Sequence, residues 1–276
     1  MNCLKSARIT FLLCTLSSTL TAASFRDDFA VVMIDAATEA KFGAFPLERS
    51  FLARGIRKAA ALGGNAVVIK FFLDLPRDPT SDLALSSALT NVPVLLQARI
   101  DDTEAHPNPF PDRFNFPGVN LQTEMSGRSG WIPLPIFAAK AKDIGFVDSS
   151  STRVPLLETY QSRTVKSLIV CCIEQATGRP ARIASNSSMK FGASRLQMDS
   201  HNCVTANLPP KDDLAYIPFH QFLEGDIPAS QIKGRIVIIG YDGPKMQSFS
   251  TTIGQVRGHR LFVYALQSIY EQVRSP

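Results

Sequence analysis

Charged side chains fall at the ends of four predicted strands, where they could line a polar cleft. One lies at or just beyond the end of each strand: Asp35, Asp74, Arg99 and Asp242. In open parallel sheets, ligands bind beyond the carboxyl ends of the strands, near the point where the strand order reverses. We therefore predict a ligand-binding cleft at this edge, lined by these four residues and by Arg49.

These residues also have structural interpretations, which stay open at this point. Aspartates at strand ends commonly cap a turn or the start of a helix, and Arg49 can pair with Glu48 or Asp35. A third interpretation is enzymatic, because Mg²⁺ and Ca²⁺ prefer carboxylate oxygens as ligands. A metal-assisted hydrolase would require Asp35, Asp74 and Asp242 to converge in space.

Motifs of the common catalytic classes are missing from the sequence. The stretch 125–130 lacks the leading glycine of a Gly-x-Ser-x-Gly nucleophile elbow. No Walker A sequence and no Gly-x-Gly-x-x-Gly occurs, and no helix promptly follows Gly240–Pro244 to form a phosphate site. The histidines are scattered and no Cys-x-x-Cys occurs, which argues against structural zinc. We therefore expect a binding protein rather than an enzyme, with no cofactor and no metal.

The first 23 residues have the layout of a secretory signal peptide. Lys5 and Arg8 precede a short apolar run, 9–16, and small residues at 21–23 allow a cut before Ser24. The alternative is a retained anchor, although the apolar run is shorter than the ~20 residues that a membrane span needs. We expect a periplasmic or secreted protein of residues 24–276, with no membrane span after cleavage.

Composition is that of an ordinary globular protein, with 45% hydrophobic and 19% charged residues. A net charge of +5 over 276 residues gives no reason to expect a nucleic-acid partner. Three cysteines follow residue 23: Cys171, Cys172 and Cys203. In an oxidising compartment a disulfide between Cys172 and Cys203 is one outcome. The other is that all three are small buried apolar residues.

Strands and helices alternate along the chain, which predicts an α/β fold. Apolar runs without polar alternation indicate strands covered on both faces, at 30–35, 65–72, 92–99 and 235–240. Helical spacing of apolar residues marks 49–62, 80–89, 164–177, 220–224 and 258–273. Strand–helix–strand order with short connections gives parallel βαβ units. We expect a mostly parallel central sheet flanked by helices.

Two regions interrupt this alternation. A strand pair is predicted at 145–148 with 153–157, and loose alternation over 183–208 predicts an insertion of short antiparallel strands. Residues 101–130 form an irregular insertion rich in proline and phenylalanine, and long loops are often functional. The insertion could make the chain a protein–protein interaction module. Its alternative role is to fold its phenylalanines over the core.

Several motifs occur in an order that matches one family. They are Val31–Asp35, Gly43–Pro46 with Arg49, Leu62–Ile69, Asp82–Leu85, Gly145–Asp148 with Arg153–Leu157, Leu223–Asp226, Ile232–Gly240 and Gly258–Ile269. Together they make residues 30 to about 273 resemble a CHASE2 domain, the extracytoplasmic sensor module of bacterial histidine kinases and cyclases. The resemblance implies one sensor domain that binds a ligand and takes part in signal transduction.

The chain departs from the family pattern at several positions. Phe45 stands where the family has tryptophan, Lys70 where an aspartate follows the second strand, and Phe262 where a histidine is usual. Residues 149–152 replace an Asp-x-Asp-Gly turn, and the acidic residue expected near Ser248 is missing. Family members continue into membrane helices and an output domain. We therefore expect this chain to act through a small molecule or a membrane-receptor protein.

Overall fold

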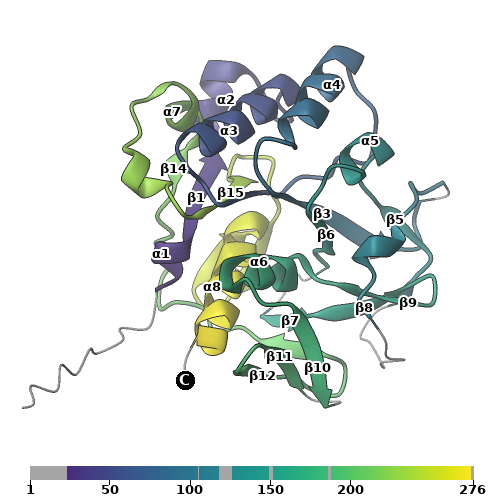
Figure 1. Ribbon diagram of the computed structural model, residues 1–276. Helices are drawn as coiled ribbons and strands as arrows, with labels where there is room; N and C mark the ends of the chain where they lie inside the picture. Colours follow the sequence, from purple (N-terminus) through teal and green to yellow (C-terminus); the bar gives the residue numbers. More distant parts are fainter. Residues whose placement is uncertain (1–23, 105, 118–125, 149–151, 186–187, 275–276) are drawn as a thin grey trace, which may run out of the picture.

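A computed structural model describes residues 24–104, 106–117, 126–148, 152–185 and 188–274 (Figure 1). The predicted signal peptide, 1–23, lies outside the described residues, as does residue 105 and the stretch 118–125 of the insertion. Within the described ranges, no helix combines the length and the apolar character that crossing a membrane requires.

A seven-stranded sheet forms the centre of the molecule. Its strands run in the order β14-β1-β15-β2-β3, and β3 also pairs with β5 and β6. Only the pairing of β3 with β5 is antiparallel. The strands are β1 (Phe29–Ile34), β2 (Ala66–Ile69), β3 (Val94–Asp101), β5 (Ser129–Trp131), β6 (Asp143–Phe146), β14 (Ile217–Pro218) and β15 (Ile236–Tyr241). The predicted α/β fold with a mostly parallel sheet is confirmed.

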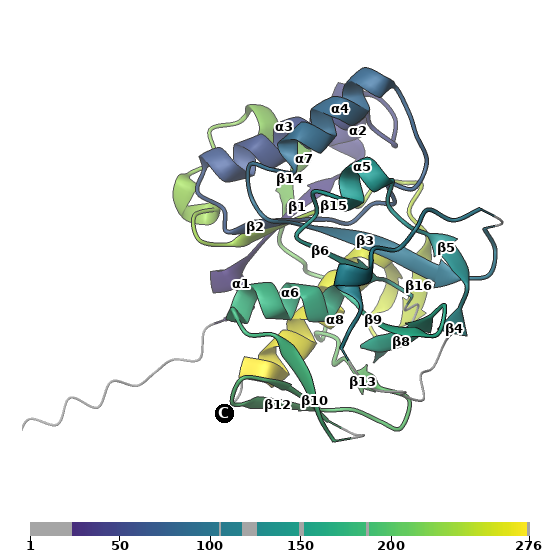
Figure 2. The same ribbon diagram turned by 45° about the vertical axis from the view of Figure 1, so that its right-hand side comes forward.

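Helices cover both faces of the sheet, as two views show (Figures 1 and 2). One face carries α2 (Ala36–Phe42), α3 (Arg49–Ala61), α4 (Pro79–Ala88), α5 (Pro135–Ala138) and α7 (Phe219–Glu224). The opposite face carries α1 (Phe25–Asp28), α6 (Leu168–Thr177) and α8 (Gly258–Arg274). Asp78 caps the start of α4, because its carboxylate accepts from the backbone N–H of Ser81 at 2.7 Å.

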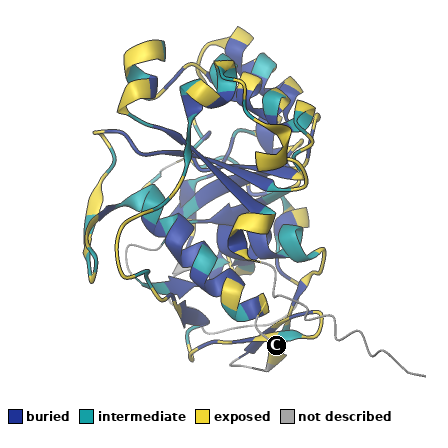
Figure 3. Cartoon of the chain, turned by 90° about the vertical axis from the view of Figure 1, so that its left-hand side faces the viewer, coloured by how far each residue is buried: buried dark blue, intermediate teal, exposed yellow. Residues whose placement is uncertain are grey.

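Two apolar cores result, one on each side of the sheet (Figure 3). In β1, Ala30, Val32 and Ile34 belong to one core, whereas Val31 and Met33 belong to the other. Every residue of β1, β2 and β15 is buried for this reason. A strand between two cores needs apolar side chains on both faces, which explains the unbroken apolar runs in the sequence.

Short antiparallel strands lie beside these layers. The expected strands within 183–208 are present as β10 (Ala181–Ser185), β11 (Ser188–Phe191), β12 (Ser194–Gln197) and β13 (Cys203–Thr205). Further pairings involve β4 (Ser126–Gly127), β7 (Arg153–Pro155), β8 (Leu157–Tyr160), β9 (Arg163–Lys166), β16 (Ser248–Thr251) and β17 (Gly254–Arg257). Single 3₁₀ turns occupy Asp112–Phe114 and Ala229–Gln231.

Two expectations about local structure are wrong. The segments 145–148 and 153–157 do not pair with each other, because β6 joins β3 in the central sheet and β7 pairs with β13. The helix predicted from residue 164 begins only at Leu168, after Ser167 accepts from the N–H of Val170 at 3.3 Å. Residues 163–166 form β9 instead, in which only Val165 is buried.

The described part of the insertion packs on the protein itself. Phe110 and Phe114 belong to the core on the α3 side of the sheet and Phe116 to the core on the α6 side. All three side chains are buried. The phenylalanines of the insertion therefore pack in the core, which is the second of the two roles expected for them.

The three cysteines within the described residues are buried thiols. Cys171 and Cys172 lie in α6, and Cys203 lies in β13. No disulfide joins Cys172 to Cys203. Of the two outcomes expected from the sequence, the structure has the one in which these cysteines act as small core residues.

Candidate ligand-binding site

A cavity of about 640 Å³ lies at the carboxyl ends of the central strands. Ile34 ends β1, Lys70 directly follows β2, and Gln97 lies in the middle of β3; all three line the cavity. His259, in the first turn of α8, adds a fourth wall. This is the edge of a parallel sheet at which ligands bind in α/β proteins.

Most of the cavity wall is apolar or aromatic. Phe72 packs edge-on against Trp131, with ring centroids 4.8 Å apart, and Phe45 packs against Phe71 at 5.3 Å. The remaining apolar lining consists of Ile34, Pro46, Leu47, Leu52, Leu73, Leu75 and Met246. Walls of this kind with a few converging polar groups are typical of small-molecule sites.

Lys70 is the most unusual of the polar lining residues. Its side chain is buried, and its ammonium group donates to Oε1 of Gln97 at 2.8 Å. The same nitrogen lies 4.8 Å from the centre of the Phe262 ring, on α8. Among the described residues, no carboxylate forms an ion pair with it. Burial lowers the pKa of Lys70 from 10.5 to about 7, although the Asp148 charge opposes this shift.

His259 is a neutral imidazole in this environment. Its Nδ1 accepts from the backbone N–H of Tyr241 at 2.9 Å, so the proton of the neutral ring is on Nε2. Burial, together with the nearby charge of Lys70, holds the pKa of His259 well below its usual value. The ring therefore offers the cavity a hydrogen-bond donor without adding charge.

A second, much smaller cavity of about 50 Å³ touches Lys70 on the side of α6 and α8. Asp148 lines it, with a side chain that is only 5% exposed. The Asp148 carboxylate accepts from the N–H of Ile100 at 3.0 Å. Burial raises the pKa of Asp148 to about 6, against the effect of that hydrogen bond and of Arg99.

Two of the five predicted site residues line the large cavity, Arg49 and Asp74. The Arg49 side chain is buried, forms an ion pair with Asp82 and donates to the carbonyl of Leu75 at 2.6 Å. Its guanidinium also lies over the Phe137 ring, at 5.1 Å from the centroid. The donors of Arg49 are thus largely used within the protein.

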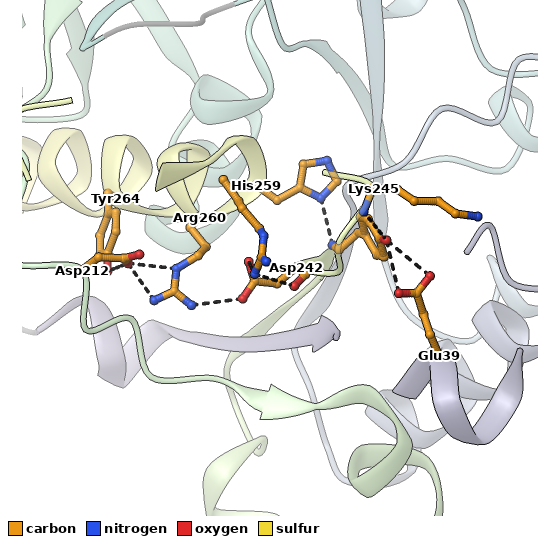
Figure 4. Close-up of polar contacts among 9 residues, drawn as sticks. Glu39, Asp212, Asp242, Lys245, His259, Arg260 and Tyr264 are labelled. Carbon is orange, nitrogen blue, oxygen red and sulfur yellow. Dashed lines mark hydrogen bonds and ion pairs between the residues drawn. The ribbon is translucent and has the colours of Figure 1, made fainter. Parts of the chain in front are cut away.

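Asp35 and Asp242 do not line the large cavity. Asp35 caps α2, accepting from the N–H of Thr38 at 2.9 Å. The Asp242 carboxylate is buried between Arg257, at 3.4 Å, and Arg260, at 3.1 Å. Figure 4 shows Arg260 bridging Asp242 and Asp212 at the start of α8. These contacts hold the segments that follow β1 and β15 in place, as the structural interpretation of strand-end aspartates predicts.

Arg99 lies outside the large cavity but supports its wall. Its guanidinium lies over the Trp131 ring, 5.0 Å from the centroid. Its Nε is 3.0 Å from a carboxylate oxygen of Asp101. The Arg99 guanidinium therefore stacks on the Trp131 ring and helps to hold it in the cavity wall.

The three aspartates of the hydrolase hypothesis do not converge. In the parts of the chain that the structure describes, no three His, Cys, Asp or Glu side chains are grouped so that they could hold a metal ion. Asp35, Asp74 and Asp242 are all within these parts. Their separate contacts remove the specific observation that the hydrolase hypothesis required.

Three residues of the cavity were missed as site residues: Lys70, Gln97 and His259. Lys70 had a visible signal, since a lysine directly after the buried run 66–69 must place its charge at the end of an apolar strand. Gln97 stands among apolar residues of β3 in the same way. His259 had no such signal, because it reaches the cavity only through the fold of α8.

Removing Arg49 tests whether its role is structural. We expect Arg49→Met to lower the free energy of unfolding by ~3–5 kcal/mol, because Asp82 would remain buried without its ion-pair partner. The double variant Arg49→Met/Asp82→Leu should recover much of this loss. Urea denaturation followed by circular dichroism measures both. An Arg49→Met variant as stable as the wild type would contradict the structural role.

Lys70 should make the stability depend on pH. Its pKa is about 7 in the folded chain, whereas the ordinary pKa of a lysine is 10.5. Between these values the unfolded chain holds more protons, so stability rises with pH. We expect Lys70→Met to raise the free energy of unfolding, measured by urea denaturation at pH 6.5, and this gain should shrink by about 2 kcal/mol towards pH 9. The exposed Lys190→Met is the control. An equal effect of Lys70→Met at both pH values would refute the buried charge.

Comparison with known proteins agrees with this architecture. The family profile of the CHASE2 domain matches residues 10–276, essentially the whole chain. No curated protein and no solved structure matches the chain. The match covers the strands that build the cavity as well as the helix α8 that closes it. The chain therefore belongs to the CHASE2 domain family, a family of extracytoplasmic sensor domains.

Proposed function

We propose that the chain senses a small molecule by binding it in the cavity at the carboxyl ends of β1, β2 and β3. The observation that carries this proposal is the cavity itself, about 640 Å³ with aromatic walls and converging polar groups from Lys70, Gln97 and His259. This volume falls in the range of small-molecule sites, roughly 300–1,000 Å³. Membership of a sensor family supports the same function.

Binding is favoured over catalysis because two of the three aspartates of the hydrolase hypothesis are used within the fold, which leaves only Asp74 in the lining of the cavity. Asp35 caps a helix and Asp242 is held between two arginines. Neither carboxylate faces the cavity that could hold a substrate.

Trp131 provides a direct test, because it is the only tryptophan in the chain and lines the cavity. We expect a compound that raises the melting temperature in a screen of metabolites to change the emission of Trp131 as well. A compound at a hundred times its Kd stabilises a protein by ~2.7 kcal/mol. Phe72→Ala, which removes the ring packed against Trp131, should weaken binding.

Phe42→Ala is the matched control for Phe72→Ala. Both phenylalanines are half-buried members of an aromatic pair. Phe42 stacks on Phe51, with ring centroids 4.7 Å apart, and does not line the cavity. Its replacement should leave the affinity unchanged. Binding that survives Phe72→Ala but not Phe42→Ala would place the ligand elsewhere and contradict the proposal.

We also propose that residues 1–23 are a secretory signal and that the ligand is met in the periplasm or outside the cell. The basic start and short apolar run of this segment support the proposal. When the full chain is produced in a bacterium with a periplasm, we expect mass spectrometry to find a mature N-terminus at Ser24. Recovery of a membrane-bound chain that still begins at Met1 would refute cleavage.

A further inference from the structure

Of the five charged residues that line the large cavity, two are buried, Arg49 and Lys70. Arg49 is paired with Asp82. Asp74, Arg77 and Glu104 are at least partly exposed, so that water can solvate their charges. Lys70 remains, with only a neutral amide oxygen and an aromatic ring around its nitrogen.

The elements packed around Lys70 do not supply the missing negative charge in direct contact. From β3 comes Gln97, which is neutral, and from α8 come His259 and Phe262. Cys172 faces Lys70 from α6, and burial raises the pKa of this thiol, so that it stays protonated. Asp148 acts on Lys70 only electrostatically, without forming an ion pair. Burying a charge without a partner is costly, so the fold retains Lys70 at an energetic cost.

We propose that Lys70 is the anchor for a carboxylate, and that the ligand of this cavity is a monocarboxylate with an apolar or aromatic body. This inference rests on the proposed function and adds the chemical class of the ligand. The carboxylate would supply the counter-charge that the protein omits, and its second oxygen can accept from the Nε2–H of His259. Phe45, Phe71, Phe72 and Trp131 would contact the body of the ligand.

Proton linkage gives this arrangement a characteristic pH dependence. A bound carboxylate favours protonated Lys70, whereas the free protein loses that proton near pH 7. Affinity for a carboxylate should therefore decrease as the pH rises from 7 to 9. Asp148 titrates near pH 6 and His259 well below its usual value, so neither changes charge in this window.

Pairs of probes that differ only in charge test the proposal. We would titrate the mature chain with 3-phenylpropionate and octanoate, and with the neutral amides 3-phenylpropionamide and octanamide, by isothermal titration calorimetry. At pH 7 we expect at least one carboxylate to bind about tenfold more tightly than its amide, as a charged hydrogen bond should provide. At pH 9 the carboxylate should bind about as weakly as the amide.

Two variants separate charge from shape. Lys70→Met should abolish the preference for the carboxylate at pH 7 and leave the affinity for the amide nearly unchanged. Lys70→Arg keeps a charge that does not titrate below pH 9, so the preference should persist at pH 9. If the arginine variant does not fold, the methionine variant alone still decides, because it removes the amine from a chain that we expect to be more stable.

The outcomes distinguish this inference from the proposed function. Equal affinity for carboxylate and amide, with both lost in Phe72→Ala, would overturn the carboxylate anchor but leave a small-molecule site. A preference that persists in Lys70→Met would also overturn it, since another cation would then be the anchor. If neither member of either pair binds and Trp131 emission does not change, the anchor is overturned, and a wider screen without hits would refute the proposed function as well.

Discussion

The pairing of β15 with both β1 and β2 is the constraint on which the rest of the structure depends. Six residue pairs join β15 to β1 and four join it to β2, so a strand from the last fifth of the chain holds the first two strands together. Both faces of these strands are covered by helices, and polar groups are tolerated only where the strands end. The carboxyl edge of the sheet is therefore the place where charge must be accommodated, and the cavity forms there.

Charges at this edge are accommodated in two different ways. Arg49 and Asp242 are neutralised by partners from neighbouring elements, Asp82 in α4 and Arg260 in α8. These pairs hold segments in place and leave little capacity for a ligand. Lys70 has no such partner within the described residues, and burying an amine without a counter-charge costs free energy. The same edge thus combines charges that are paired within the fold with one charge that has no ion-pair partner among the described residues.

Much of the fold was predictable because local patterns and tertiary burial agree. The apolar runs of β1 and β15 and the spacing in α3 and α8 determined type and position to within a residue or two. Pairing was harder, because β6 and β7 are chosen by distant partners rather than by their own sequences. The end of the sheet at which the cavity lies was also predictable, but the residues that line the cavity were not. Whether a strand-end aspartate faces a cavity or caps a helix depends on the next segment, as Asp35 shows. Lys70 was visible in the sequence, but its importance follows only from the lack of an ion-pair partner in the described structure.

The helix α8 connects the two edges of the sheet. It begins beside the cavity with His259 and places Tyr270, about three turns later, against Phe25 and Phe29 at the opposite ends of the strands. Seventeen residues span about 25 Å as a single helix, and its apolar side is buried along most of that length. Because one unbroken helix makes both sets of contacts, the wall of the cavity and the start of β1 share a single packing element.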